Sequence, residues 1–424
     1  MAFRRTEFIS VVIFILFVVS CSSNATTPAT PTQVNMPIAS STPTGIPTIE
    51  PTLPPSPHPA DTPTATPISI NLYLPNGITT FSSGNSKVYY YDLRGQLLGE
   101  LQSVTLGMGS LQQAIVADRL TYSPEPILPP LIYHTFENGG ELWQNDNSNV
   151  TLLRAAPNLL NIISASGKDI FDFTLLEYLD YGLGSNLYVG DLQTITTVDP
   201  ILQSISTEST AVKPLAISIN DGQPAGIWYT SVPYGIGGDI VFEPRASLSY
   251  LNLSDYQTQT HLDMTKDPIG ISDDQSWVAY TPANGIGPVS ITQNFDFSTA
   301  VTIPLGPDSD RGAGEAVFSP DNQYLAWKEA SGSIAAQPST FHETVRIASV
   351  DGKVITEISD TSLLSASGYS EISWLVPIGW LDPQTLALEV QGSSVENVSI
   401  LTVKFDGSGL AFLAPGSFIG FLYP

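Results

Sequence analysis

The chain of 424 residues contains one cysteine, Cys21, so it cannot form an internal disulfide. It is also poor in cations, with 15 Lys and Arg against 40 Asp and Glu, and its formal net charge is −25. Binding to nucleic acid requires a basic surface, and electrostatic docking on anionic lipid requires clustered cations. The composition therefore speaks against nucleic acid and against a membrane bound by charge as partners.

Several catalytic motifs are missing. The sequence has no G-x-S-x-G, P-loop, G-x-G-x-x-G or H-E-x-x-H pattern, which argues against a serine peptidase, a nucleotide site and a zinc peptidase site. The four histidines, His58, His134, His261 and His342, are too far apart to have metal-ligand spacing. We therefore expect no cofactor, no metal and no catalytic residues.

The amino terminus has the three zones of a signal peptide. Arg4 and Arg5 precede an almost wholly apolar run from Ile9 to Ser20. As a helix rising roughly 1.5 Å per residue, this run falls well short of the roughly 30 Å hydrocarbon core of a bilayer. A signal-peptide core at residues 1–20 is therefore favoured over a permanent transmembrane helix.

The four residues Val18-Val19-Ser20-Cys21 resemble the bacterial lipobox, although Val stands first where Leu is usual. The resemblance implies cleavage before Cys21, lipid on its sulfur and acylation of the new amino terminus. An ordinary secretory signal with a chance cysteine is the alternative. Lipidation also accounts for a lone thiol in an exported protein, and several acyl chains would hold the protein firmly on a membrane.

The segment 21–69 is built mainly of Thr, Pro, Ser and Ala. It has too few large apolar residues to offset the entropy lost on ordering, so we expect it to be disordered. Proline favours extended polyproline II. The composition therefore predicts a semi-stiff stalk, a type of segment that is often O-glycosylated.

Residues 70–424 contain internal repeats. The segments 269–283 and 316–330 share the order apolar residue, Ser, turn residues, large apolar residue, aliphatic residue, Ala and aromatic residue. Weaker copies lie at 162–173, 215–230 and 378–390, which gives a period of about 50 residues. Alternating segments that end in polar turns, such as 247–253, 344–352 and 399–407, predict further half-buried strands.

The run Phe318-Ser319-Pro320-Asp321-Asn322-Gln323-Tyr324-Leu325-Ala326-Trp327 resembles the repeat of TolB-type and WD-like β-propellers. The match is good there, fair around Ser272 and loose elsewhere, and Asn322 replaces the usual Gly. TolB itself has an α/β domain where this chain has the Thr/Pro-rich segment. The resemblance therefore implies the propeller fold and not the identity of TolB.

The predicted fold is all-β, a propeller of about seven four-stranded antiparallel blades, because four short strands cannot fold alone and must pack on neighbours. Six or eight blades also fit, and residues 70–85 are a candidate for a strand that closes the ring. The seven expected units are 86–120, 122–156, 158–200, 213–263, 267–306, 313–359 and 372–416.

Acidic residues recur at the expected turns. They are Asp273, Asp274, Asp321, Asp351, Asp382 and Asp406. Their oxygens suit Ca²⁺, but Asp also caps turns by bonding to the backbone. We favour capping. The segment Asp308–Gly312 begins like a calcium loop and then departs from the EF-hand pattern.

Two expected loops between second and third strands are long, 231–246 and 330–343, and both should emerge on one face of the propeller. Long loops tend to carry function. We expect the ligand face to involve residues in or beside these loops, namely Trp228, Tyr229, Tyr234, Glu243, Arg245 and His342.

The sequence favours a non-enzymatic binding or scaffold protein, lipid-anchored through Cys21 and exposed to the periplasm or the exterior. Its expected partners are the membrane, through the lipid, and an envelope protein or glycan on the propeller face. A hydrolase or lyase acting on envelope polysaccharide, with acidic residues in the propeller channel, is the alternative. The first strands at Ala216–Ile219 and Ala316–Ser319 speak against it, because they carry apolar or small residues.

Overall fold

The computed structural model divides the chain into two units, Met1–Pro67 and Ile68–Pro424. The predicted signal peptide and almost all of the predicted stalk belong to the first unit, which lies outside the described residues. The structure describes residues 74–82, 87–102, 119–121, 131–136, 139–145, 150–156, 159–167, 170–178, 184–190, 202–205, 210–220, 223–233, 241–242, 245–283, 286–333, 336, 339–394 and 396–423. Within these residues, no helix has the length and apolar character needed to cross a membrane.

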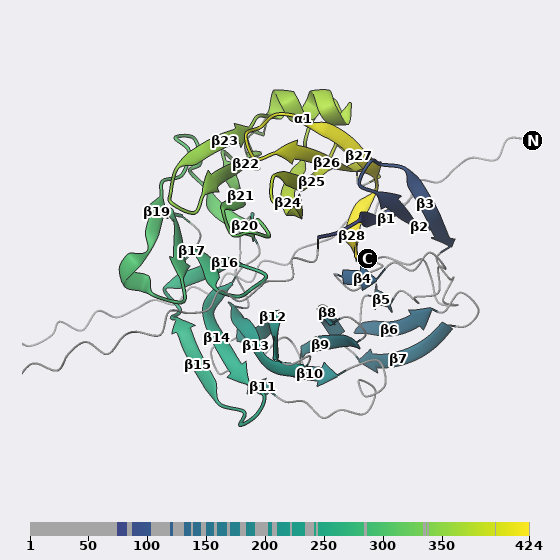
Figure 1. The fold of residues 1–424 in the computed structure, drawn as a ribbon, viewed down its shortest axis with the longest axis vertical. Coiled ribbons are helices and arrows are strands. Elements are labelled where there is room, and N and C mark those ends of the chain that lie inside the picture. Colours follow the sequence, from purple (N-terminus) through teal and green to yellow (C-terminus); the bar gives the residue numbers. More distant parts are fainter. Residues whose placement is uncertain are drawn as a thin grey trace, which may run out of the picture. The chain divides into compact units, whose positions relative to one another are not determined.

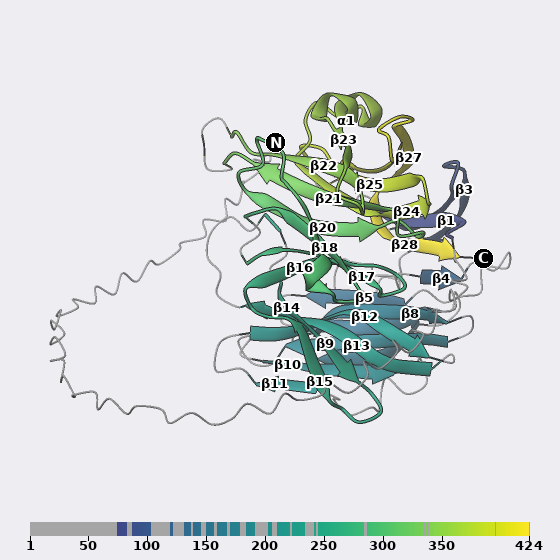
Figure 2. The same ribbon diagram turned by 60° about the vertical axis from the view of Figure 1, so that its left-hand side comes forward.

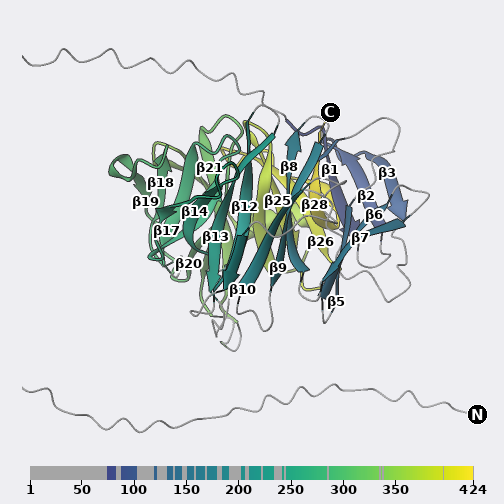
Figure 3. The same ribbon diagram turned by 90° about the horizontal axis from the view of Figure 1, so that it is seen from below.

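The described residues of the second unit form seven sheets, which stand around a common centre (Figure 1). We call them blades 1 to 7. Views from two other directions show the sheets side by side around the ring (Figures 2 and 3). This arrangement is that of a β-propeller, as the repeats predict.

Blades 3 to 7 each contain four antiparallel strands in sequence order, with the first strand innermost. Blade 3 consists of β8 (Leu159–Gly167), β9 (Ile170–Tyr178), β10 (Gly184–Gly190) and β11 (Leu202–Ile205). Blade 4 consists of β12 (Thr210–Asn220), β13 (Gln223–Pro233), β14 (Ala246–Asn252) and β15 (Thr258–Leu262). Blade 5 consists of β16 (Lys266–Ile271), β17 (Trp277–Pro282), β18 (Val289–Gln293) and β19 (Val301–Ile303), with the 3-10 turn η2 (Phe297–Thr299). Blade 6 consists of β20 (Gly312–Phe318), β21 (Tyr324–Ser331), β22 (His342–Ser349) and β23 (Val354–Ile358). Blade 7 consists of β24 (Trp374–Asp382), β25 (Thr385–Gln391), β26 (Val398–Lys404) and β27 (Ala411–Pro415).

Blades 1 and 2 depart from the expected four strands. In the described residues, blade 2 has three, β5 (Leu131–Phe136), β6 (Gly139–Asn145) and β7 (Val150–Ala156). Blade 1 joins the two ends of the second unit: β28 (Ser417–Tyr423) pairs with β1 (Gly77–Ser82), which continues into β2 (Lys87–Asp92) and β3 (Leu97–Gln102). The short strand β4 (Arg119–Thr121) adds to the other edge of β28 in parallel. The segment 70–85 thus contains a strand of the closing blade, and the carboxyl-terminal strand beside it completes the closure.

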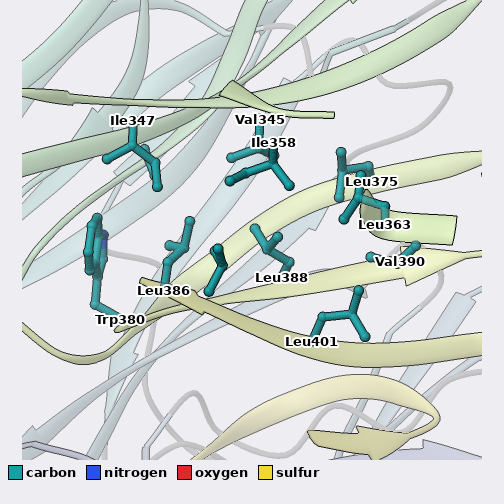
Figure 4. Close-up of a cluster of buried hydrophobic side chains, with 12 residues drawn as sticks. Val345, Ile347, Ile358, Leu363, Leu375, Trp380, Leu386, Leu388, Val390 and Leu401 are labelled. Carbon is teal, nitrogen blue, oxygen red and sulfur yellow. The ribbon is translucent and has the colours of Figure 1, made fainter. Parts of the chain in front are cut away.

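Apolar side chains from neighbouring blades fill the space between sheets. Between blades 6 and 7 the buried cluster includes Val345, Ile347, Leu386, Leu388 and Leu401 (Figure 4). The helix α1 (Asp360–Ser367), which the repeat pattern does not predict, lies between β23 and β24 in sequence and adds Leu363 to the same cluster. Each fully buried side chain of this size contributes about 1.5–3 kcal/mol of hydrophobic stabilisation. The blades therefore depend on one another for their stability.

The repeated Ser-x-Asp turns hold the first two strands of blades 5 and 6 together. In blade 6 the Ser319 hydroxyl donates to Asp321 Oδ1 at 2.7 Å and accepts from the Tyr324 amide at 2.9 Å. In blade 5 the Ser272 hydroxyl does the same with Asp274 at 2.6 Å and the Trp277 amide at 2.9 Å. The Ser-x-Asp spacing thus recurs in both blades because it places the same hydrogen bonds at the same turn.

The propeller has two faces because successive connections of an antiparallel sheet lie at opposite ends. The turn face carries the short turns between first and second strands, such as 272–277, 319–324 and 382–385. The loop face carries the connections between second and third strands, including 234–245 in blade 4 and 332–341 in blade 6. The two long loops predicted from the sequence therefore do share one face.

Candidate functional site

Trp228, one of the six residues expected near the ligand face, is buried between blades 4 and 5. Its ring stacks on Phe295 at 4.6 Å between centroids and lies 5.0 Å from the His261 ring. Its indole N–H donates to Gln275 Oε1 of blade 5 at 2.9 Å. The described contacts of Trp228 therefore hold two blades together.

The other five candidates are not gathered into one group. Tyr229 is buried in a separate cluster with Val212, Ile227 and Leu251. His342 is exposed at the start of β22, where a ring nitrogen lies 2.9 Å from the Ser331 hydroxyl. Tyr234 and Glu243 lie outside the described residues. Arg245 remains, and it leads to an ionic cluster on the loop face.

We call this group the Lys328 cluster: Lys328, Glu315, Glu343 and Arg245. The Lys328 side chain has 0% exposure, and its Nζ lies 2.8 Å from Glu315 Oε2 and 3.2 Å from Glu343 Oε1. Arg245, from the long loop of blade 4, is attracted to the carboxylate of Glu315 in blade 6. Three charged residues of blade 6 thus lie together near the inner strand β20, and one cation from the loop of blade 4 is attracted to them.

Aromatic rings flank the ammonium of Lys328. The ring centroids of Phe242 and Trp374 lie 5.4 Å and 5.7 Å from Nζ, within cation–π range. Phe242 approaches β20 so closely that a Cβ on Gly314 would come within 2.6 Å of its Cδ1 atom. Because Gly314 has no side chain, the Phe242 ring can pack against blade 6, and the end of the blade 4 loop lies there with it.

The two carboxylates are positioned differently. Glu343 is almost fully buried, and its Oε2 accepts from the Leu375 amide at the start of β24 at 2.6 Å. Burial raises the pKa of Glu343, and Lys328 opposes the shift. Glu315 lies in a bulge of β20, at a positive φ of 52°, and is partly exposed. A non-glycine residue is strained at such a φ, so the backbone conformation that places this carboxylate beside Lys328 is itself unfavourable.

A second buried carboxylate of blade 6, that of Glu329, has hydrogen-bond partners at both of its oxygens. Glu329 accepts from the Trp327 indole and the Gly306 amide, each at 2.8 Å, and pairs with Arg346 at 3.2 Å. In contrast, neither Glu315 Oε2 nor Lys328 Nζ completes a hydrogen bond of good geometry with another described residue. Arg346 Nε also lacks such a bond, but both oxygens of Glu329 accept hydrogen bonds, so Glu315 is the less satisfied carboxylate. This marks the Lys328 cluster as the candidate site.

Glu315, Lys328 and Glu343 are not among the residues predicted from the sequence. A signal was present, because Lys328 and Glu329 interrupt the apolar pattern of a strand that the repeat predicts to be buried. The partners of Lys328 could not be read from that signal, since they come from other strands and from a loop two blades away.

The acidic turns serve as caps in the described residues. Asp351, Asp406 and Asp382 accept from backbone amides two residues ahead, as Asp274 and Asp321 do. The hydrogen bond and charge of Lys353 and the hydroxyl of Ser349 hold the pKa of Asp351 at about 2. Within the described part of the chain, no three His, Cys, Asp or Glu residues are grouped so that they could hold a metal ion.

Comparison with known proteins gives no match to a family model and none to a curated protein. Similar solved structures exist. One is a prolyl endopeptidase, with a TM-score of 0.50, 8% identity, and coverage of 80% of this chain and 50% of that chain. The β-propeller domain of the trilobed protease from Pyrococcus furiosus gives 0.44 and 10%, with coverage of 78% and 92%. An oligogalacturonate lyase from Vibrio parahaemolyticus gives 0.44 and 10%, with coverage of 81% and 85%. At these identities the likeness concerns the fold alone, and the chain spans half of the endopeptidase.

Proposed function

We propose that the chain is a lipid-anchored surface protein that holds a β-propeller on a stalk and binds an envelope protein or glycan on the loop face, without catalysis. The lipobox at Val18–Cys21 supports the anchor, and the Thr/Pro-rich segment 21–69 supports the stalk. The propeller supplies a broad rigid surface for binding.

The place where the chain joins the propeller carries this proposal. The Asn76 amide donates to the Leu422 carbonyl at 2.8 Å, and Gly77 pairs with Leu422 near the end of β28. β28 follows the outer strand β27 of blade 7, so it starts at the loop face and ends at the turn face. Because β1 is antiparallel to β28, it begins at the turn face, opposite the loop face to which we assign the partner.

Two exposed apolar residues allow the faces to be compared. Ile286 lies in the loop between β17 and β18 on the loop face and is 64% exposed. Tyr256 lies in the turn between β14 and β15 on the turn face and is 60% exposed. Ile286→Asp and Tyr256→Asp thus form a matched pair of charge insertions on opposite faces.

The test uses the full chain, purified from membranes, in pull-down from solubilised envelope and on a glycan array. For the ligand so identified, Ile286→Asp should weaken binding by about tenfold or more, while Tyr256→Asp leaves it unchanged. The reverse order, or two unchanged affinities with the loop 332–341 also replaced by a short turn, would overturn the assignment of the loop face.

A polysaccharide-active hydrolase or lyase remains the second candidate, because Glu315 and Glu343 form a carboxylate pair near the inner strand of blade 6. One is buried with a raised pKa and the other is partly exposed, a contrast seen between acid and base in glycoside hydrolysis. However, both carboxylates contact one ammonium, so Lys328 occupies the space that a sugar ring would need.

The two candidates differ in a simple assay. Release of new reducing ends or unsaturated products from envelope polysaccharide by the purified chain, and its loss in Glu315→Gln, would favour the enzyme. Binding of the same polysaccharide without any product would favour the binding protein.

A further inference from the structure

We propose that Lys328 and Glu343 become joined by an isopeptide bond, formed within the folded chain with Glu315 as the proton carrier. The bond would link β21 to β22 through their side chains in the interior of blade 6. It is independent of the partner that the loop face binds.

The nucleophile and the electrophile are already in contact. Lys328 Nζ lies 3.2 Å from Glu343 Oε1, and both side chains are buried. The strands fix this approach, because Lys328 pairs with Val345 and Ala330 pairs with Glu343 in the antiparallel register. Groups held at such a distance react with a large effective concentration, which offsets the weak electrophilicity of a carboxyl group.

Glu343 is prepared for attack at both oxygens. The Leu375 amide donates to Oε2 at 2.6 Å, so this oxygen would carry the negative charge of the tetrahedral intermediate and remain as the carbonyl of the product. Oε1, on the side of Lys328, would leave. Burial also favours the protonated carboxyl of Glu343, which is the form that an amine can attack.

Glu315 is placed to move the proton. Its Oε2 lies 2.8 Å from Lys328 Nζ and has no other hydrogen-bond partner of good geometry among the described residues. It would take a proton from the ammonium, which frees the nitrogen lone pair, and deliver it to Oε1, which gives the neutral carboxyl that the amine attacks. After the attack it would take a second proton from the same nitrogen and deliver it to Oε1, which then leaves as water. The bond Nζ–Cδ forms, the bond Cδ–Oε1 breaks, and one water leaves. An ammonium and a carboxylate become a neutral amide, and no oxidant or other reactant is needed.

The surroundings favour the amide. Phe242 and Trp374 flank the ammonium of Lys328, and the buried site limits the return of water. Buried charges are costly, and the reaction removes one of each sign. The charges that remain, Glu315 and Arg245, attract each other.

Digestion of the wild-type protein with trypsin, followed by mass spectrometry, tests for the bond directly. Between Arg311 and Arg346 the only cleavage site is Lys328. Unlinked, denatured protein would give the two peptides 312–328 and 329–346. The linked chain would resist cleavage at Lys328 and give one peptide, 312–346, lighter than its linear form by the mass of one water. Fragmentation should place the link between Lys328 and Glu343.

Three variants assign the roles. Lys328→Arg keeps the charge and the cleavage site but cannot form the amide, and should give two peptides. Glu315→Gln should give mostly the two unlinked peptides, because proton transfer is lost. Glu389→Gln changes another buried carboxylate, in blade 7, and should leave the link intact. Complete cleavage of the wild-type chain at Lys328, or a link on Glu315 in place of Glu343, would overturn the proposal.

Discussion

Single buried carboxylates control how tightly neighbouring blades are held. Glu343 accepts the amide of Leu375, the second residue of the inner strand of blade 7, and Glu389 on β25 accepts the Phe418 amide of the closing strand at 2.6 Å. In each case one side chain accepts a hydrogen bond from a backbone donor of the next blade. These contacts lie on the loop face, where the inner strands begin.

Glu389 makes the ring closure sensitive to pH. Burial raises its pKa to about 7. Among the described residues that pack around it, β1, β27 and β28 present no charged side chain, and Asp382 and Lys404 lie at the far ends of β24 and β26. The folded chain therefore keeps the proton of Glu389 up to a higher pH than the unfolded chain does. The stability that depends on this bound proton is present at low pH and is lost as pH rises through about 7.

Glu389→Gln should remove this pH dependence, because the amide oxygen of Gln accepts the Phe418 amide at every pH. The free energies of unfolding of Glu389→Gln and wild type are measured with urea at about pH 5 and about pH 8. The difference between variant and wild type should be more favourable to the variant at the higher pH, by on the order of 3 kcal/mol. The exposed Glu100, paired with Lys87, provides the control Glu100→Gln. An equal slope in Glu389→Gln and wild type would show that Glu389 does not titrate in this range.

Asn322 has two roles at one turn, and two substitutions separate them. It adopts a φ of 57°, and its Nδ2 donates to Asp274 Oδ2 of blade 5 at 2.8 Å. Asn322→Ala loses both the tolerated backbone and the bond, so the free energy of unfolding should fall by about 2 kcal/mol. Asn322→Gly loses the bond alone and should cost about half as much. Gln323→Ala, at an exposed position, should change stability by less than about 0.5 kcal/mol. Equal stability of the Ala and Gly variants would contradict the backbone role.

At the scale of strands, the repeats predicted most of the blades because their signals are local. The Ser-x-Asp turn and the alternating strands lie within one unit of sequence, and their hydrogen bonds close inside one blade. The pairing of β1 with β28 could not be derived in the same way. Its residues lie at opposite ends of the second unit, and any apolar edge strand would suit either end equally well.

The Lys328 cluster was out of reach of sequence reasoning for a related reason. From a loop of blade 4, Phe242 contacts blade 6 and Arg245 is attracted to Glu315, so no short pattern connects them with Lys328. The bulge that turns Glu315 toward Lys328 depends on the register of β20 with β21. Sequence showed where the long loops would be, and only the fold shows what they touch.

The closing strand β28 should decide whether the ring folds as one unit. Removal of residues 417–424 leaves one edge of β1 without the partner β28 and leaves Glu389 without the Phe418 amide. It also exposes apolar side chains of blades 1 and 7. We expect the cooperative thermal transition in calorimetry to be lost or to shift downward by at least about 10 °C. Removal of Pro424 alone is the control. A truncated chain that melts like wild type would mean that closure adds little stability.

For the whole molecule, the decisive residue is the single cysteine. If lipid on Cys21 holds the chain, Cys21→Ala should release it into the medium or the periplasm, because the apolar run Ile9–Ser20 is too short to anchor it instead. Ser22→Ala leaves the lipobox unchanged and should remain with the membrane. Fractionation followed by detergent phase partitioning measures the outcome, and a pull-down with the released form then asks whether the loop face binds its partner without the anchor. Retention of Cys21→Ala on the membrane would refute the lipid anchor, while leaving the fold and the Lys328 cluster untouched.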